Sequence, residues 1–244
     1  MAFSNCGHVT HVGNVRQHNE DAYRIDTEFN FGVLADGMGG HEGGEIASRI
    51  VVDCVCQGIR EGRPMADALV QAHHAVRKAA NNGEGKPGMG STALVLKMDA
   101  DHFEIVWVGD SRAYHWDGEA LTQITKDHSL VQTLVDEGSI TLAEARVHPQ
   151  RNYITQAIGM SDLQTMQVGR VQGRLYQGQQ LLLCSDGLSG EVSELEMAEI
   201  LKLELNEKQK TDLLIQKSLD NGGADNVTVL LVSAVPGIAE VESD

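Results

Sequence analysis

The sequence predicts an α+β fold in which two antiparallel β-sheets pack as a sandwich and a pair of helices covers each outer face. The four layers have the order α-β-β-α. Strand-like segments occur in consecutive runs and do not alternate singly with helices, which argues against a doubly wound parallel sheet. Helix-like segments come as two adjacent pairs, one on either side of a run of strands. A helix pair on each outer face would bury the apolar side of both sheets.

The first part of the chain contains three strand-like segments and then the first helix pair. The strands are expected at 9–15, 22–25 and 30–35. Apolar residues recur at helical spacing between Ile46 and Val55, which predicts a helix with a wide apolar stripe. Glycines and Pro64 separate it from a second helix, whose apolar face includes Leu69 and Ala80.

The middle of the chain has the pattern of a meander of short antiparallel strands. Two strands are expected at 92–98 and 103–108. A further hairpin is expected from strands at 112–116 and 119–121, for which Asp117-Gly118 predicts a two-residue turn.

Residues 127–158 differ from their surroundings and are expected to form a flap subdomain. They contain two short helix-like stretches, at 129–137 and 141–146, and many polar residues. Segments of this kind often form a lid over a site. An ordinary connector packed on the surface is the alternative.

The last third of the chain returns to strands and then to helices. Strands at 163–171 and 180–184 precede the second helix pair, at 193–205 and 207–219, and an apolar strand follows at 227–235. No internal repeat or linker marks a second unit, so we expect residues 1–244 to form a single domain.

The composition and charge of the chain limit the class of protein and the partners that we expect. With 41% hydrophobic and 22% charged residues, the chain is typical of soluble globular proteins. Its formal net charge of -16 would repel nucleic acid and anionic membranes, so neither is an expected partner. No apolar run approaches the ~20 residues that cross a bilayer, and residues 1–6 lack a signal-peptide pattern. We therefore expect a cytoplasmic protein.

The four cysteines form no Cys-x-x-Cys pair and are expected to be core hydrophobic residues.

Four aspartates lie at the ends of apolar, strand-like runs beside Gly, Ser or Asn. They are Asp36, Asp110, Asp186 and Asp225. Asp36 is followed by five glycines in eight residues, a backbone that can approach a ligand closely. Each aspartate alone could simply cap a strand or a turn. Four in the same context suggest that the carboxylates converge in one place.

Converging carboxylates without a matching set of His and Cys favour magnesium or manganese over zinc or copper. Carboxylates placed together repel one another unless protons or cations intervene. Two cations about 3.5–4 Å apart could share one aspartate and a water that acts as a nucleophile near neutral pH. Arg16 adds a planar cation suited to phosphate, although a local pair with Glu20 or Asp21 is the alternative. Residues 41–45 do not complete the zinc-protease motif His-Glu-x-x-His, because the fifth residue is Glu.

Seven motifs occur in a fixed order over nearly the whole chain. They are Arg16 with Asn19-Glu20-Asp21, Ala35-Asp36-Gly37-Met38-Gly39-Gly40-His41, Gly90-Ser91-Thr92, Val108-Gly109-Asp110-Ser111-Arg112, Thr125-Lys126-Asp127-His128-Ser129, Ser185-Asp186-Gly187-Leu188 and Gly223-Ala224-Asp225-Asn226-Val227-Thr228. In this order they resemble the metal-dependent protein serine/threonine phosphatases of type 2C, in their short bacterial form. The sandwich fold of that family agrees with the order of elements predicted above.

The resemblance implies a metal centre that holds Mn²⁺ or Mg²⁺. By this resemblance Asp36 bridges two ions, and the Gly37 backbone carbonyl binds one of them. Asp186 and Asp225 resemble the ligands of the other ion. Asp110, together with Asp186, matches the position at which bacterial members hold a third, weaker ion.

The resemblance also implies roles around the metals. Glu20 and Asp21 are similar to the outer acids that hold metal-bound waters, and Arg16 corresponds to the arginine that binds phosphate. A water or hydroxide bridging the two metals would attack phosphorus, and the leaving oxygen needs a proton. Animal members have a histidine directly after the Asp-Gly pair, where this chain has Met38. His41 is the candidate general acid, and a metal-bound water is the alternative.

The expected function is therefore hydrolysis of phosphoserine and phosphothreonine in proteins, opposing serine/threonine kinases in a bacterial cytoplasm. A metal-dependent phosphoesterase acting on small phosphoesters is one alternative. A non-catalytic binding module with a phosphatase fold is another, and it predicts missing metal ligands. We expect phosphoproteins and a separately encoded serine/threonine kinase as partners, and a monomer.

Overall fold

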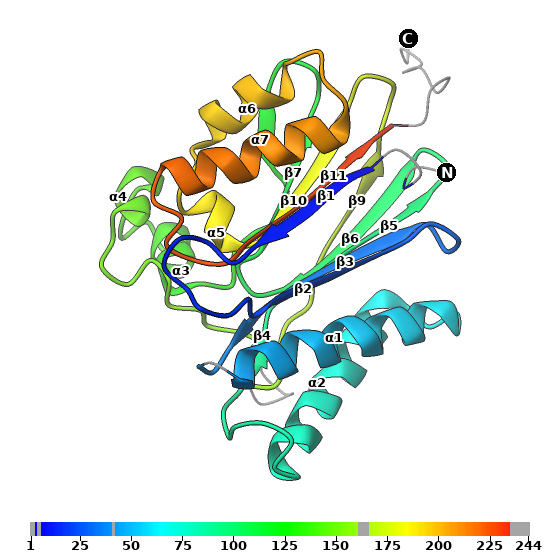
Figure 1. Cartoon of the computed structure of the whole chain (residues 1–244), viewed down its shortest axis with the longest axis vertical. Helices are drawn as coiled ribbons and strands as arrows, with labels where there is room; N and C mark the ends of the chain where they lie inside the picture. Colours follow the sequence, from blue (N-terminus) through cyan, green and yellow to red (C-terminus); the bar gives the residue numbers. More distant parts are fainter. Residues whose placement is uncertain (1–2, 4–5, 41, 161–165, 235–244) are drawn as a thin grey trace.

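The computed structural model has the four predicted layers: two antiparallel sheets pack face to face, and helices cover both outer faces (Figure 1). It describes residues 3, 6–40, 42–160 and 166–234. Among these residues, no helix is both long enough and apolar enough to cross a membrane.

We name the two sheets after a central strand of each. The β11 sheet has the order β1 (Cys6–His11), β11 (Val227–Ser233), β10 (Gln180–Cys184), β7 (Arg112–Trp116) and β8 (Leu121–Gln123). The β3 sheet has the order β2 (Asp21–Asp26), β3 (Phe31–Met38), β5 (Ala93–Asp99), β6 (His102–Val108) and β9 (Gly169–Arg174), and the short β4 (Gly90–Ser91) pairs with the end of β3. Neighbouring strands pair antiparallel throughout.

Each sheet has its own helix pair. The β3 sheet is covered by α1 (Glu42–Arg60) and α2 (Met65–Asn81). The β11 sheet is covered by α6 (Glu194–Leu201) and α7 (Glu207–Asp220), with the short α5 (Asp186–Ser189) beside them. Two more short helices, α3 (Leu130–Asp136) and α4 (Leu142–Arg146), lie in residues 127–158, which we call the flap.

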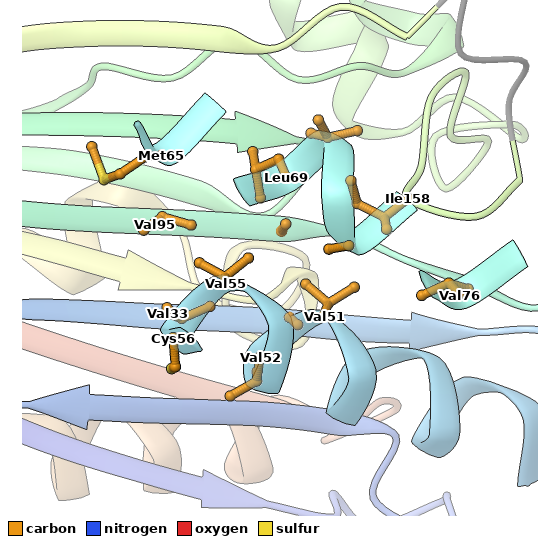
Figure 2. Packing of buried hydrophobic residues seen from close by; sticks show 14 of the residues in the cluster. Val33, Val51, Val52, Val55, Cys56, Met65, Leu69, Val76, Val95 and Ile158 are labelled. Carbon is orange, nitrogen blue, oxygen red and sulfur yellow. The ribbon is translucent and has the colours of Figure 1, made fainter. Parts of the chain in front are cut away.

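Central strands are apolar on both faces because successive residues point to opposite sides of a sheet. In β3, Val33 packs under the helices and Leu34 packs between the sheets. In β11, Leu230 packs between the sheets and Leu231 packs under α6 and α7. Figure 2 shows the layer between α1 and the β3 sheet, where Val55 lies over Val33. This packing holds the ends of both sheets at fixed positions.

Some local predictions are wrong, each for a short-range reason. The loop between β7 and β8 has four residues, since Trp116 pairs with Leu121 and the Asp117 carboxylate accepts bonds from the amides of residues 119 and 120. The first strand ends at His11, because residues 12–15 form a loop. The helix α5 was not predicted. It is only one turn long, too short to show periodicity.

The remaining predicted elements agree in type. The strands at 112–116 and 180–184 also match in their bounds, and the others differ at one or both ends. The predicted strand at 163–171 falls partly on residues 161–165, outside the described part of the chain, and β9 begins at Gly169. Helices α3, α4 and α6 begin after Ser129, Thr141 and Ser193, whose side chains accept a bond from the backbone amide three residues on. The four cysteines are free, and Cys56 and Cys184 are buried.

Candidate active site

Five aspartates from both sheets meet at one end of the sandwich. Asp21 and Asp36 face each other in the antiparallel pair β2–β3, and Asp110 follows β6 in the same sheet. Asp186 follows β10, and Asp225 precedes β11, in the other sheet. The charges of Asp21, Asp186, Asp110 and Asp225 all act on Asp36. The four strand-end aspartates predicted to converge do lie together, and Asp21 joins them.

The backbone around Asp36 is held by its neighbours. The Asp36 amide donates to the Thr92 hydroxyl at 2.9 Å, and the Thr92 amide donates back to the Asp36 carbonyl at 2.8 Å. The Gly37 amide donates to the Glu20 carbonyl at 3.1 Å. A Cβ at Gly37 would overlap the Gly44 carbonyl at the start of α1, so a glycine is required for this close approach. Gly37 is therefore placed beside Asp36 by packing, with its backbone close to the site.

Asp21 links the two sheets. Its Oδ2 accepts hydrogen bonds from the hydroxyl of Ser185, directly after β10, at 2.8 Å and from the hydroxyl of Thr228, in β11, at 2.6 Å. The Thr228 amide in turn donates to the Ser185 hydroxyl at 2.9 Å. Burial raises the pKa of Asp21 to about 7, although these two hydroxyl bonds favour the carboxylate. Oδ2 of Asp21 is thus fixed by hydrogen bonds, and Oδ1 has no hydrogen-bond partner among the described residues.

Burial and mutual repulsion dominate the electrostatics. Burial and the charge of Asp225 raise the pKa of Asp186 to about 6. Burial, followed by the charges of neighbouring aspartates, raises the pKa of Asp36 and of Asp110 well above the ordinary value. Within the described residues, Oδ1 of Asp21 and Oδ1 of Asp110 are buried without a hydrogen-bond partner. A cluster of this kind is stabilised by positive charge.

The donor set fits hard divalent cations. All the charged donors are carboxylates, which suits Mg²⁺ or Mn²⁺, and the orphaned oxygens are free to take a ligand. In the described part of the chain, no group of three or more His, Cys, Asp or Glu side chains could hold an ion unaided. Any ion bound here would therefore complete its shell with backbone carbonyls and water, as Mg²⁺ commonly does.

Arg16 pairs with Asp225, which lies far from it in the sequence. Its Nη2 lies 2.7 Å from Oδ2 of Asp225, and about half of the Arg16 side chain is exposed. The pKa of Arg16 is raised by the charge of Asp225 against the opposing effect of burial, so the guanidinium stays charged. The loop that carries Arg16 is held by Asn226, whose amide group donates to the carbonyls of Val12 and His18.

The other predicted site residues are partly placed. Oδ1 of Asn226 also accepts a hydrogen bond from the Glu20 amide at 2.8 Å. The Glu20 carboxylate lies close to Gly44, where a Cβ would overlap it. His41 lies outside the described residues. The sequence assigns no role to Ser185, Asn226 or Thr228. Ser185 and Asn226 stand next to an aspartate in the sequence, and Thr228 lies three residues after one.

A pocket of about 670 Å³ extends from the aspartates between the flap and helices α5 and α6. Its lining includes Asp110, Asp186 and Asp225 at the carboxylate cluster, with Leu142 and Arg151 from the flap. A chain segment several residues long could therefore lie in it with one residue at the carboxylates. Residues within 127–158 thus line part of this pocket.

Two ion pairs hold the flap against the body. Arg112 forms a bidentate pair with buried Asp127: Nε donates to Oδ1 at 3.1 Å and Nη2 donates to Oδ2 at 2.8 Å. Arg146 of α4 pairs with Glu194 at the start of α6. The flap is thus anchored at its first residue and again near its middle.

Comparison with known proteins is consistent with this geometry. A family model described as protein phosphatase 2C matches residues 10–221. The chain is 39% identical over 234 residues to the serine/threonine protein phosphatase PstP of Mycobacterium tuberculosis, covering 91% of this chain but only 43% of that protein. It is 34% identical to the serine/threonine phosphatase stp of Listeria monocytogenes, covering 91% of this chain and 93% of that one. It is 36% identical to the protein phosphatase PhpP of Streptococcus pneumoniae, covering 92% and 95%.

Solved structures agree with the fold. The Mycobacterium tuberculosis phosphatase PstP/Ppp superposes with a TM-score of 0.84 at 34% identity, over 93% of this chain and 97% of that one. The catalytic domain of PstP in complex with two manganese ions superposes with a TM-score of 0.81 at 34% identity, over 94% and 97%. The Staphylococcus aureus serine/threonine phosphatase Stp1 gives a TM-score of 0.84 at 34% identity, over 95% of each chain.

Proposed function

Because the chain belongs to the protein phosphatase 2C family, we propose that it hydrolyses phosphoserine and phosphothreonine in proteins and so opposes serine/threonine kinases. The observation that carries the proposal is the meeting of five aspartates from two sheets beside Arg16, at the mouth of a pocket. The pocket is large enough for a peptide segment, which favours a protein substrate.

We propose Mn²⁺ or Mg²⁺ as the cofactor, with two ions and a third, weaker one. The solved PstP domain with two manganese ions supports a pair. Bound ions would supply Lewis acidity and lower the pKa of a water toward neutrality. Asp36 would bridge the pair, and the Gly37 carbonyl would bind one ion of it. Asp186 and Asp225 would hold the other ion, and Asp110 with Asp186 would hold the third.

Asp21 and Glu20 fit an outer role. Oδ2 of Asp21 is engaged by two hydroxyls, which leaves Oδ1 to accept a hydrogen bond from a water of hydration. Glu20 borders the start of α1, and its carboxylate is proposed to accept a hydrogen bond from a water of hydration as well.

Arg16 is proposed to bind the phosphoryl oxygens of the substrate. Its side chain is half exposed and is oriented by Asp225. The guanidinium can therefore turn toward a ligand without breaking a buried ion pair. Two parallel N–H donors on a phosphoryl group would offset the charge that develops on those oxygens as the bond to the leaving oxygen breaks.

We propose His41 as the group that protonates the leaving seryl or threonyl oxygen. His41→Ala should lower kcat by about 10²-fold and flatten the high-pH limb of the kcat profile, because a general acid must be protonated to act. The measurement is kcat against pH on a phosphothreonine peptide. A profile unchanged in height and shape would remove His41 from the mechanism. Addition of imidazole should restore part of the activity to His41→Ala.

Turnover of a phosphothreonine peptide, compared with nucleotides at equal concentration, tests the proposed function. We expect Mn²⁺-dependent phosphate release from the peptide, its loss with a chelator, and a much lower kcat/KM on nucleotides. The reverse preference would favour the small-phosphoester alternative. A non-catalytic binding module would release no phosphate from either substrate, and the presence of Asp36, Asp186 and Asp225 in one cluster argues against it.

We further propose a single domain over residues 1–244, with residues 127–158 as its flap. The Arg112–Asp127 and Arg146–Glu194 pairs support a flap that packs on the same body as the site. A cytoplasmic monomer acting against a separately encoded kinase, without nucleic acid or membrane partners, is consistent with the net charge of -16. Light scattering coupled to size exclusion would test the monomer.

A further inference from the structure

The first residues of the flap are joined to the end of β6 by a set of reciprocal contacts. The His128 amide donates to the Gly109 carbonyl at 2.9 Å, and the Gly109 amide donates to Nδ1 of the His128 ring at 3.2 Å. Trp107 stacks on that ring, with centroids 6.4 Å apart and planes 26° apart. Nε1 of Trp107 donates to the Lys126 carbonyl at 2.9 Å. One histidine thus engages both polar backbone groups of Gly109.

Gly109 matters because it immediately precedes Asp110. Its φ of +108° lies in the region that favours glycine, and a Cβ there would lie 2.6 Å from the methyl of Thr92. On the other side of Asp110, the Ser111 hydroxyl is 2.8 Å from the Thr92 hydroxyl. Asp110 is therefore held from both sides, by His128 through Gly109 and by Thr92 through Ser111.

The Asp110 carboxylate needs this precision. Asp110 is 7% exposed, and its Oδ1 is one of the buried oxygens that lack a partner among the described residues. A buried carboxylate oxygen without a hydrogen-bond partner can bind a cation, and it does so well only when the carboxylate is held in one position. The Gly109 amide would also be unpaired without the His128 ring, and a buried unpaired amide is costly.

The hydrogen bond defines the state of the ring. Nδ1 is the acceptor, so in the neutral ring the proton is on Nε2, and a doubly protonated ring could not accept from Gly109. Burial lowers the pKa of His128, while the charge of Asp127 opposes this. The ring is accordingly neutral at pH 7, as the contact requires.

We propose that His128 is a positioning residue for the cation site at Asp110: its ring nitrogen fixes the Gly109 peptide and thereby aims the Asp110 carboxylate. The first residues of the flap and the Asp110 carboxylate then form one rigid unit. The proposal rests on the metal assignment made for the proposed function. It assigns His128 no contact with substrate or with the metal.

Two substitutions separate the hydrogen bond from the stacking. His128→Asn keeps an acceptor near the position of Nδ1 and loses the ring. His128→Phe keeps a ring against Trp107 and loses the acceptor. Trp107→Phe is the matched control, because it keeps the stacking and loses only the bond to the Lys126 carbonyl. Asp110→Asn marks the full loss of the site.

Calorimetric titration of each metal-free variant with Mn²⁺ gives the first readout. We expect His128→Phe to weaken the weakest Mn²⁺ site by about 10-fold or more, as loss of a residue that orients a ligand commonly does, and to leave the tighter sites unchanged. His128→Asn and Trp107→Phe should stay within about 3-fold of the wild type, and His128→Phe combined with Asp110→Asn should add nothing to Asp110→Asn. Equal weakening in His128→Phe and His128→Asn, or none in His128→Phe, would overturn the proposal.

Nuclear magnetic resonance of the wild type gives a second readout that needs no variant to fold. At pH 7 the His128 ring should carry its proton on Nε2, and the Gly109 amide should exchange slowly. A proton on Nδ1 would overturn the proposal. If the wild type binds no Mn²⁺ at all, the metal assignment fails instead. If it binds Mn²⁺ and His128→Phe binds all ions equally well, only the positioning role fails.

Discussion

Asp36→Asn is expected to lower Mn²⁺-dependent phosphate release from a phosphothreonine peptide by at least about 10³-fold, since the carboxylate proposed to bridge both ions loses its charge. Asparagine has the same shape, and the bonds between Asp36 and Thr92 use only the backbone of Asp36, so the fold should be intact. Single-turnover and steady-state rates, each at saturating Mn²⁺, measure the loss. Asp225→Asn should behave alike. Retained activity in both variants would refute the metal assignment.

Asp26→Asn is the matched control. Asp26 is a buried aspartate at the opposite end of β2, paired with Arg60 at 2.6 Å and bonded to the amides of residues 28 and 29. It contributes to stability and lies away from the carboxylate cluster. Its loss should lower the midpoint of thermal unfolding and leave kcat per folded molecule unchanged. An equal loss of kcat in Asp26→Asn would show that Asp36→Asn acts through general damage.

The carboxylate cluster also predicts an effect on stability. A carboxyl whose pKa is raised on folding binds more protons in the folded state, so stability falls as pH rises from the unfolded pKa toward the folded one. For Asp186 and Asp21 these folded values are about 6 and about 7, against 3.8 unfolded. The metal-free protein should therefore lose stability between about pH 4 and pH 7. Asp36→Asn should reduce that loss, and it should also remove most of the stabilisation by Mn²⁺.

Arg16→Ala is expected to lower kcat/KM on the phosphothreonine peptide by about 10²–10³-fold, because the planar donor pair for the phosphoryl oxygens is lost. Arg16→Lys keeps the charge but not the fork, and it should recover only part of the loss. Inhibition by inorganic phosphate should weaken in the same order, which places the defect at the phosphoryl group.

Arg24→Ala is the matched control for Arg16→Ala. Arg24 is a similarly exposed arginine that forms a surface ion pair with Asp53 at 3.0 Å, in the same half of the chain. Its loss should leave kcat/KM unchanged. If Arg16→Ala also stays within about 3-fold of the wild type in both kcat and KM, Arg16 does not bind the phosphoryl group, and its pair with Asp225 is only structural.

The architecture could be predicted because its signals are local. Val33 and Leu34 are adjacent and both apolar, so β3 had to be buried on two faces, and this implies layers on either side. The convergence of Asp36, Asp110 and Asp186 could be predicted for a similar reason. In the sequence each stands at the end of an apolar run beside a small residue, and the ends of such strands come together at one edge of a sandwich.

The parts that could not be predicted depend on contacts between distant residues. Nothing near Arg16 in the sequence indicates that its partner is Asp225, 209 residues away. The bonds from Ser185 and Thr228 to Asp21 exist only once the two sheets have docked. The turn at Asp117 differs from these, because its contacts are local. Asp117-Gly118 predicts a turn at the right place, but the Asp117 carboxylate accepts bonds from the amides of residues 119 and 120, which makes the loop four residues long.

The pairing of β1 with β11 has a consequence for synthesis of the protein on the ribosome. Cys6 pairs with Val232, so β1 gains this neighbour only after β11 has been made. Asp225 precedes β11 and emerges equally late. The β3 sheet and its two helices, which end near residue 174, can pack while translation continues. A nascent chain is therefore expected to stay catalytically silent until Asp225 and β11 have left the ribosome.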